Sequence, residues 1–179
     1  MILGGKTILE KYCIGDITID PFEFKMIGPN SYDVHLGRNF KRVLTNSYSG
    51  DYGHGEPYIN PNEKQAYIKY EDEDFIIIKP GELWLAHTVE KIGSTKFVPM
   101  LEGRSSIGRM GLFVHITAGF GDVGFVDQWT LELTSVLPIK IYSGMRIAQV
   151  FFHTLTDNSM QYSGRYVGQY GAQESRFNE

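Results

Sequence analysis

The sequence has almost no cysteine, no long apolar run and no excess of basic residues. Cys13 is the single cysteine among 179 residues, so no disulfide can form within the chain, and a reducing, cytoplasmic location is expected. No stretch approaches the roughly 18 apolar residues that a membrane span needs, and the first residues lack the apolar core of a signal peptide. The net charge of -4 argues against a general nucleic-acid surface, which needs a basic face.

The residues of a zinc deaminase are missing as well. Such enzymes carry a His-x-Glu motif followed by Pro-Cys-x-x-Cys, because the metal generates the hydroxide, and one cysteine cannot supply that site. The histidines at positions 35, 54, 87 and 153 stand isolated, without metal-ligand spacing. Any deamination by this chain would have to activate water with side chains alone.

What the sequence does contain is a series of short β-type segments. Hydrophobic residues make up 42% of the chain and charged residues 21%, as in an ordinary globular domain, and residues 1–179 are expected to form a single one. The pattern predicts one short helix over residues 4–13 and then strands at 16–20, 75–78, 83–89, 139–142 and 147–152. The last two, joined by Ser143-Gly144, are predicted to form a hairpin. These features predict an all-β, mainly antiparallel barrel or jelly-roll.

Two stretches are expected to lie outside the core. Residues 48–64 are rich in Gly, Asn, Pro, Tyr and acidic residues, which predicts a long surface excursion. Residues 160–179 are polar and glycine-rich and are expected to add nothing to the core. This tail is interpreted as a flexible lid that orders on a ligand, with a frayed terminus as the alternative.

The densest set of candidate binding groups is Glu-Gly-Arg-Ser-Ser-Ile-Gly-Arg at residues 102–109. The guanidinium groups of Arg104 and Arg109 offer planar forks of donors that suit phosphate oxygens. The hydroxyls of Ser105 and Ser106, with backbone N–H groups beside glycine, would complete a phosphate cradle. The Gly-Lys-Ser/Thr ending of a Walker loop is missing. The residue types therefore fit either an oligophosphate site or a solvated loop.

Glu132 is the main candidate for acid–base chemistry. It stands between Leu131 and Leu133 in a β-type run, so its side chain points to the opposite face from both leucines. A carboxylate there either faces solvent or lies in a polar pocket, where it would suit proton transfer. Asp122, in a glycine-flanked turn, is a second candidate or a turn-stabilising residue. His115 is expected to be a packed strand histidine rather than a ligand.

These motifs follow one another in the order found in a known family. They are Met-Ile-Leu at 1–3, Pro-Asn-Ser-Tyr-Asp-Val-His-Leu-Gly at 29–37, Gly-Arg-Ser-Ser-Ile-Gly-Arg-Met-Gly-Leu at 103–112, Thr-Ala-Gly-Phe-Gly-Asp-Val-Gly-Phe at 117–125, Thr-Leu-Glu-Leu at 130–133, Gly-Met-Arg-Ile-Ala-Gln at 144–149 and Tyr-Ser-Gly-Arg-Tyr-Val-Gly-Gln at 162–169. The ordered set makes the chain resemble the dCTP deaminase family of the dUTPase-like superfamily over nearly its whole length. The resemblance implies a distorted β-barrel or jelly-roll subunit in a homotrimer, with active sites between subunits.

The resemblance also implies a reaction and its residues. The reaction is zinc-independent hydrolysis of dCTP to dUTP and ammonia, in the supply of dUMP and dTTP precursors, with Mg²⁺ held by the triphosphate and dTTP as a candidate inhibitor. Glu132 would be the general base and acid for the water that attacks C4 of cytosine. Ser105, Arg109 and the backbone carbonyl of Ala118 would orient that water. The implied nucleotide-binding residues are Arg104, Ser105, Ser106, Ile107, Gly108, Arg109, Asp122, Thr130, Leu131, Glu132, Gln149, Tyr162, Arg165 and Gln169.

One motif bears on whether the reaction stops at dUTP. Thr-Ala-Gly-Phe at residues 117–120 resembles the bifunctional branch of the family, which continues to dUMP and diphosphate; single-step members carry a bulkier residue in place of Gly119, beside Phe120. Asp122 would then activate a second water at the phosphate. We therefore hypothesise both activities.

The sequence departs from the family pattern at several positions. Gly121 and Val123 stand where an aliphatic residue and a proline are usual, which is expected to loosen the turn at Asp122. Val-Asp-Gln at residues 126–128 replaces a small residue and glycine, and Arg165 replaces a lysine. A modified cytosine nucleotide or a monophosphate stays open as the substrate. The alternatives to a deaminase are a plain dUTPase and a non-catalytic nucleotide sensor on the same scaffold.

Overall fold

The structure is a computed structural model that describes residues 1–44, 59–157 and 160–177. Within these ranges two short helices, α1 (Gly5–Cys13) and α2 (Ser105–Gly108), accompany a 3-10 turn at Phe24–Met26 and eleven strands. The strands are β1 (Ile17–Asp20), β2 (Tyr32–His35), β3 (Phe40–Leu44), β4 (Ala66–Tyr70), β5 (Phe75–Ile78), β6 (Trp84–Ser94), β7 (Phe97–Gly103), β8 (Leu112–Phe113), β9 (Val126–Ser135), β10 (Ile139–Tyr142) and β11 (Arg146–Thr154). The predicted all-β class is confirmed.

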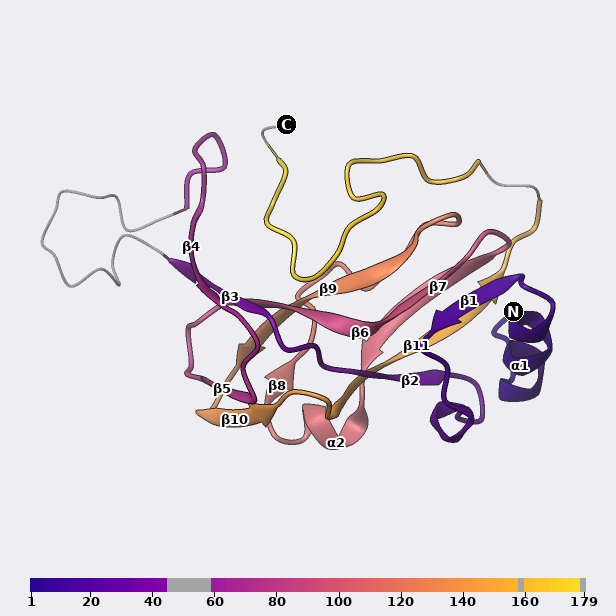
Figure 1. Ribbon diagram of the computed structural model, residues 1–179, viewed down its shortest axis with the longest axis horizontal. Coiled ribbons are helices and arrows are strands. Elements are labelled where there is room, and N and C mark those ends of the chain that lie inside the picture. Colours follow the sequence, from indigo (N-terminus) through magenta and orange to yellow (C-terminus); the bar gives the residue numbers. More distant parts are fainter. Residues whose placement is uncertain (45–58, 158–159, 178–179) are drawn as a thin grey trace, which may run out of the picture.

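The strands form three sheets, and every pairing between named strands in the described ranges is antiparallel. The six-stranded sheet has the order β4-β3-β6-β9-β8, with β1 added along β6. A three-stranded sheet has the order β2-β11-β7, and β5 pairs with β10 in a two-stranded sheet. The three sheets wrap around one core as a distorted barrel (Figure 1).

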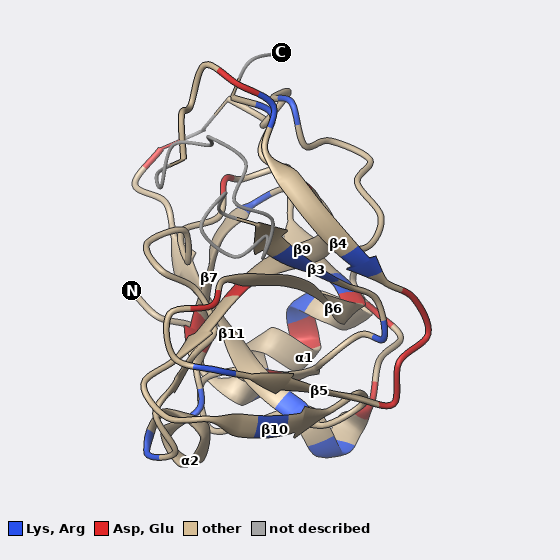
Figure 2. Ribbon diagram, turned by 90° about the vertical axis from the view of Figure 1, so that its left-hand side faces the viewer, with Lys and Arg blue, Asp and Glu red and all other residues tan. Residues whose placement is uncertain are grey.

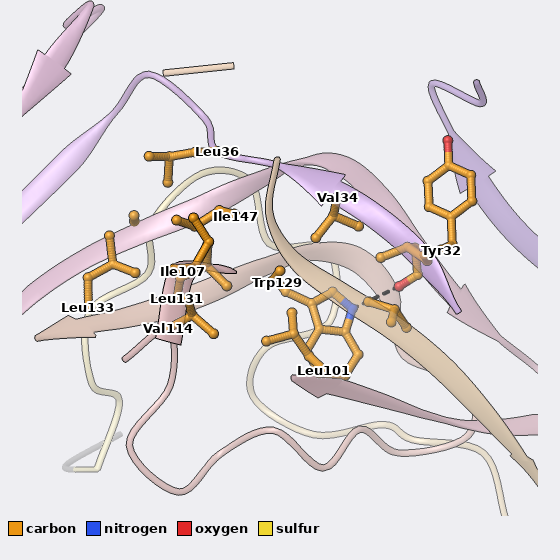
Figure 3. Close-up of a cluster of buried hydrophobic side chains, with 14 of the residues drawn as sticks. Tyr32, Val34, Leu36, Leu101, Ile107, Val114, Trp129, Leu131, Leu133 and Ile147 are labelled. Carbon is orange, nitrogen blue, oxygen red and sulfur yellow. Dashed lines mark hydrogen bonds between the residues drawn. The ribbon is translucent and has the colours of Figure 1, made fainter. Parts of the chain in front are cut away.

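Strand β9 has one face in the core and the other on the outer face of the six-stranded sheet. Trp129, Leu131 and Leu133 are buried in the core, whereas Thr130 and Glu132 between them are only partly buried. Figure 3 shows the leucines packed beside Ile107, which comes from α2 and is 3% exposed. The two-residue period therefore places Glu132 on the opposite face of β9 from the core, as predicted.

The predicted hairpin between residues 139–142 and 147–152 is wrong, although both strands exist. β10 pairs with β5, and β11 pairs with β2 and β7. The turn between them is held by Leu36, whose N–H donates to Met145 O at 2.9 Å while Gly144 N–H donates to Leu36 O at 2.7 Å. The two strands diverge because these long-range bonds occupy the turn.

The C-terminal tail, residues 160–177, packs on the body of the protein. It contains no helix or strand in the described residues, yet Gln169 and Ala172 are 7% and 5% exposed. The expectation that the tail adds nothing to the buried interior is therefore wrong at Ala172. Most of the predicted surface excursion, residues 48–58, lies outside the described residues. In the described ranges, no helix has the length and apolar character needed to cross a membrane.

Candidate active site

A cavity of about 1120 Å³ lies on the outer face of the six-stranded sheet, beneath the C-terminal tail. One wall is the loop 116–122, the floor is β9, the far wall comes from β3 and β4, and the tail covers it. Seven of the expected site residues line this one cavity: Ala118, Phe120, Asp122, Thr130, Glu132, Tyr162 and Gln169.

Glu132 is fixed at the wall of the cavity. Its side-chain Oε2 accepts a hydrogen bond from the N–H of Ile116 at 3.0 Å. Its own backbone N–H donates to Val114 O at 3.1 Å, so the loop and the strand hold each other. A carboxylate held in this way has a defined position in the cavity, which Ala118 also lines.

The turn that carries Asp122 is packed, not loose. A Cβ atom added at Gly121 would lie 2.4 Å from Trp129 Cη2 and 2.9 Å from Pro99 Cγ, so the indole fills the space of the missing side chain. Val123 is 5% exposed, and its carbonyl accepts a hydrogen bond from Tyr162 N–H at 2.7 Å. The expectation that these two substitutions loosen the turn is therefore wrong, because Trp129 and the tail fill and tie it.

Gly119 sits where a side chain has no room. An added Cβ would lie 2.5 Å from Leu101 O and 2.9 Å from His115 Nε2. The ring of His115 is itself held by Glu102, with Nε2 and Oε2 3.3 Å apart. His115 is partly buried and paired, and its ring lies next to Gly119. The expected strand position is wrong, because β8 ends at Phe113 and His115 lies in the loop that follows it.

The arginine loop, residues 104–109, belongs to a different cluster. Asp33 on β2 pairs with Arg104 (Nε–Oδ1 3.2 Å) and with Arg146 (Nη1–Oδ2 3.3 Å). Gln149 lies beside them, where it accepts a hydrogen bond from Ser31 Oγ at 3.0 Å and donates to Gly103 O at 3.2 Å. The side chains of Ser105, Ser106 and Arg109 are exposed. The arginines, serine hydroxyls and N–H groups of this cluster are hydrogen-bond donors that suit an anionic ligand.

The structure does not bring the arginine loop and Glu132 together within one chain. None of residues 104–109 lines the cavity. Ile107 is buried beside Leu131 and Leu133 on the core side of β9 (Figure 3). Glu132 faces outward, because burial alternates along the strand. Figures 1 and 2 both place α2 at the end of the molecule opposite the tail. The expected site residues therefore fall into two halves, a carboxylate half at the cavity and an arginine half at α2.

Three expected residues have positions that limit how they can act. The side chain of Leu131 is fully buried in the core, so only its backbone could meet a nucleotide. Arg165 donates through Nη1 to the carbonyls of Arg176 and Phe177, within the tail. Gln169 donates through Nε2 to Gln128 O at 2.5 Å, so this amide anchors the tail.

Further residues of the cavity were not indicated by the sequence. On its far side Glu174 pairs with Lys41 (3.0 Å) and Lys69 (3.8 Å). Burial opposes ionisation of Glu174, but the hydrogen bond and charge of Lys41, with the charges of Lys69 and Lys64, outweigh it and lower the pKa of the carboxyl. In the described residues no group of three His, Cys, Asp or Glu side chains is placed to hold a metal ion.

Comparison with known proteins gives consistent matches. A family model described as dCTP deaminase-like matches residues 2–155. A dCTP deaminase, dUMP-forming, from Leptospira biflexa serovar Patoc is 42% identical over 176 residues, covering 98% of this chain and 95% of that protein. The protein of the same name from Clostridium acetobutylicum is 43% identical over 181 residues, with the same coverage of both chains.

One solved structure has a similar fold. The 2'-deoxycytidine 5'-triphosphate deaminase from Agrobacterium tumefaciens superposes with a TM-score of 0.64 at 16% identity, covering 86% of this chain and 47% of that one. This chain thus spans about half the length of that protein. At this identity the match describes the fold, and it supports the distorted-barrel architecture.

Proposed function

The chain belongs to the dCTP deaminase-like family, and from this membership we propose that it hydrolyses dCTP to dUMP, with release of ammonia and diphosphate. Glu132 carries the proposal, because its carboxylate is fixed in a cavity that also contains Asp122 and Thr130. The cavity volume of about 1120 Å³ leaves room for a nucleotide beside these groups.

The deamination step needs one base that later acts as an acid. Glu132 accepts one proton from a water as its oxygen bonds to C4 of the cytosine ring, and passes that proton to N3. It then takes the remaining proton of the new hydroxyl and delivers it to the departing 4-amino group. The C–N bond breaks, ammonia leaves, and the oxygen of the water becomes the 4-carbonyl of uracil. The Ala118 carbonyl, with Ser105 and Arg109, orients the water.

The second step breaks the bond between the α- and β-phosphates. Asp122 accepts a proton from a second water that attacks the α-phosphorus, and diphosphate leaves. Gly119 leaves the loop before Asp122 without a side chain at that position, and Phe120, the next residue, lines the cavity. Magnesium enters with the triphosphate as part of the substrate, and neutralises phosphate charge there. Arg104 and Arg109 contribute further positive charge.

We propose that the complete site forms between subunits of a homotrimer. The support is the separation of the two halves, since the arginine half lies at α2 and the carboxylate half lines the cavity on the outer face of β9. Closed rotational symmetry lets each arginine half meet the carboxylate half of a neighbour, and a trimer contains three such sites. dTTP, which shares the deoxyribose and triphosphate of the substrate, is proposed as an inhibitor. The reaction is proposed to take place in the cytoplasm.

Product analysis tests the proposed function. Wild type and Glu132→Gln are incubated with dCTP or dUTP and Mg²⁺, and ammonia, dUMP and diphosphate are measured. Wild type is expected to release ammonia and diphosphate from dCTP, and the variant no ammonia. Diphosphate from dUTP without ammonia from dCTP would instead identify a plain dUTPase. No product from either nucleotide would identify a sensor.

A further inference from the structure

Two adjacent side chains at the start of β9, Asp127 and Gln128, contact the C-terminal tail but have no part in the proposed chemistry. Asp127 Oδ2 accepts a hydrogen bond from Gly168 N–H at 2.8 Å. Gln128 Oε1 accepts one from Gly171 N–H, also at 2.8 Å. The backbone carbonyl of Gln128 accepts a third, from the Gln169 amide. Both residues belong to the segment 126–128 that is expected to depart from the family pattern.

The side chain of Gln128 is bonded to the sheet as well as to the tail. Gln128 is 6% exposed, and its Nε2 donates to Val89 O on β6 at 3.0 Å. Because one end of the amide is bonded to the sheet, the other end presents its oxygen to the tail. An acceptor that is already oriented loses little side-chain entropy when the tail docks.

The tail has the backbone that these acceptors require. Gly168 and Gly171 have positive φ angles of 73° and 69°, a conformation that favours glycine. The N–H groups of both glycines are the donors to the two side chains. A side chain at either glycine would strain the turns that aim these donors.

Beyond the glycines the tail crosses the cavity and is tied on its far side. Gln173 N–H donates to Thr130 Oγ1 at 3.1 Å, and Glu174 pairs with Lys41 on β3. Figure 1 shows this yellow segment passing over β9. The contacts at Asp127 and Gln128 therefore fix one end of a strap that runs over the proposed nucleotide site.

We propose that Asp127 and Gln128 are positioning residues that dock the tail over the nucleotide, and so set the affinity for dCTP. The inference rests on the proposed function, because that function places a nucleotide in the cavity beneath the tail. Loss of the Asp127 acceptor shifts the tail towards undocked conformations and weakens nucleotide binding, while the position of Glu132 is unchanged. We expect Asp127→Ala to raise KM for dCTP about three- to tenfold, the effect of one hydrogen bond, with a smaller change in kcat.

The test combines kinetics with limited trypsin digestion of the full-length protein. The tail contains two trypsin sites, Arg165 and Arg176. Asp127→Ala is expected to speed cleavage at these sites and to raise KM. Asp127→Asn keeps an oxygen acceptor and is expected to restore both values towards wild type. Asp74→Ala, which removes an exposed carboxylate paired with Arg38, is the matched control and is expected to change neither.

Each result has a defined meaning. Unchanged tail cleavage in Asp127→Ala overturns the docking role. Faster cleavage with an unchanged KM overturns the positioning role. If wild type releases no ammonia the proposed function fails, and the digestion still decides whether Asp127 docks the tail.

Discussion

Gly119 lies in the loop between Ala118 and Asp122, at a position that has no room for a side chain. Because a Cβ there would lie 2.5 Å from Leu101 O and 2.9 Å from His115 Nε2, a large side chain must displace the loop that carries Asp122. Gly119→Leu is therefore expected to lower the fraction of consumed dCTP that ends as dUMP, so that dUTP accumulates in chromatographic analysis.

Gly4→Ala is the control for that substitution, because its nearest atom, Pro29 O, would lie 3.8 Å from the new Cβ. The control should convert dCTP to dUMP as wild type does. Complete conversion to dUMP by Gly119→Leu would show that this glycine has no influence on the second step.

His87 is expected to make stability depend on pH. Its side chain is 5% exposed, and burial lowers the pKa of the imidazole below the ordinary 6.5, although a hydrogen bond to Thr88 O opposes this. The unfolded chain therefore binds a proton more readily than the folded one. The contribution of His87 to the free energy of unfolding is complete above about pH 6.5 and is lost as the pH falls from there towards the lowered pKa.

His87→Asn removes the titrating ring and keeps an amide donor for Thr88 O. Urea unfolding at pH 7.5 and 5.5 should show a smaller loss of stability in the variant than in wild type. An equal loss in both proteins would show that His87 is not responsible.

At the scale of residues, the sequence could predict Glu132 but not its surroundings. The alternation of residues 130–133 fixes the direction of one side chain relative to its neighbours, and the structure has that direction. The bond from Ile116 N–H to Glu132 and the Asp33–Arg104 pair join segments far apart in the sequence. No local pattern carries such information.

At the scale of elements, substitutions on the two faces of β9 are expected to change the free energy of unfolding by different amounts. Leu133 is 0% exposed, whereas the next residue, Thr134, lies on the opposite face and is partly buried. Leu133→Ala is expected to lower the free energy of unfolding by about 2–5 kcal/mol, because it leaves a cavity in the core. Thr134→Ala should change it by about 0.5 kcal/mol or less. Equal losses in urea unfolding would contradict the assignment of the faces.

Element positions were easier to predict than pairings. Helix α1 and strands β5 and β10 lie where local patterns placed them. The pairing of β10 with β5 and of β11 with β2 and β7 depends on long-range bonds, such as those of Leu36, which no turn motif encodes. The packing of the tail was missed for the same reason, since its partners are Asp127, Gln128 and Thr130 on β9.

At the scale of the whole molecule, the separation of the two half-sites is the feature that most constrains the mechanism. Ile107 anchors the arginine loop on the core side of β9 (Figure 3). Glu132 lies on the other side of that strand. The proposed reaction uses both groups, and for this reason we propose that Glu132 comes from one copy of the chain and Arg109 from another. The order of motifs along the sequence could predict both halves but not their separation, which is set by the packing of α2.

Subunit complementation tests this account most directly. Glu132→Gln and Arg109→Ala are each expected to be inactive with dCTP, because each removes one required group from every site of the homotrimer. Mixed at a one-to-one ratio, dissociated and reassembled, they should regain ammonia release at about one quarter of the wild-type rate, since random assembly combines an intact Glu132 with an intact Arg109 in about that fraction of sites. A mixture no more active than the two separate variants would contradict a site shared between subunits.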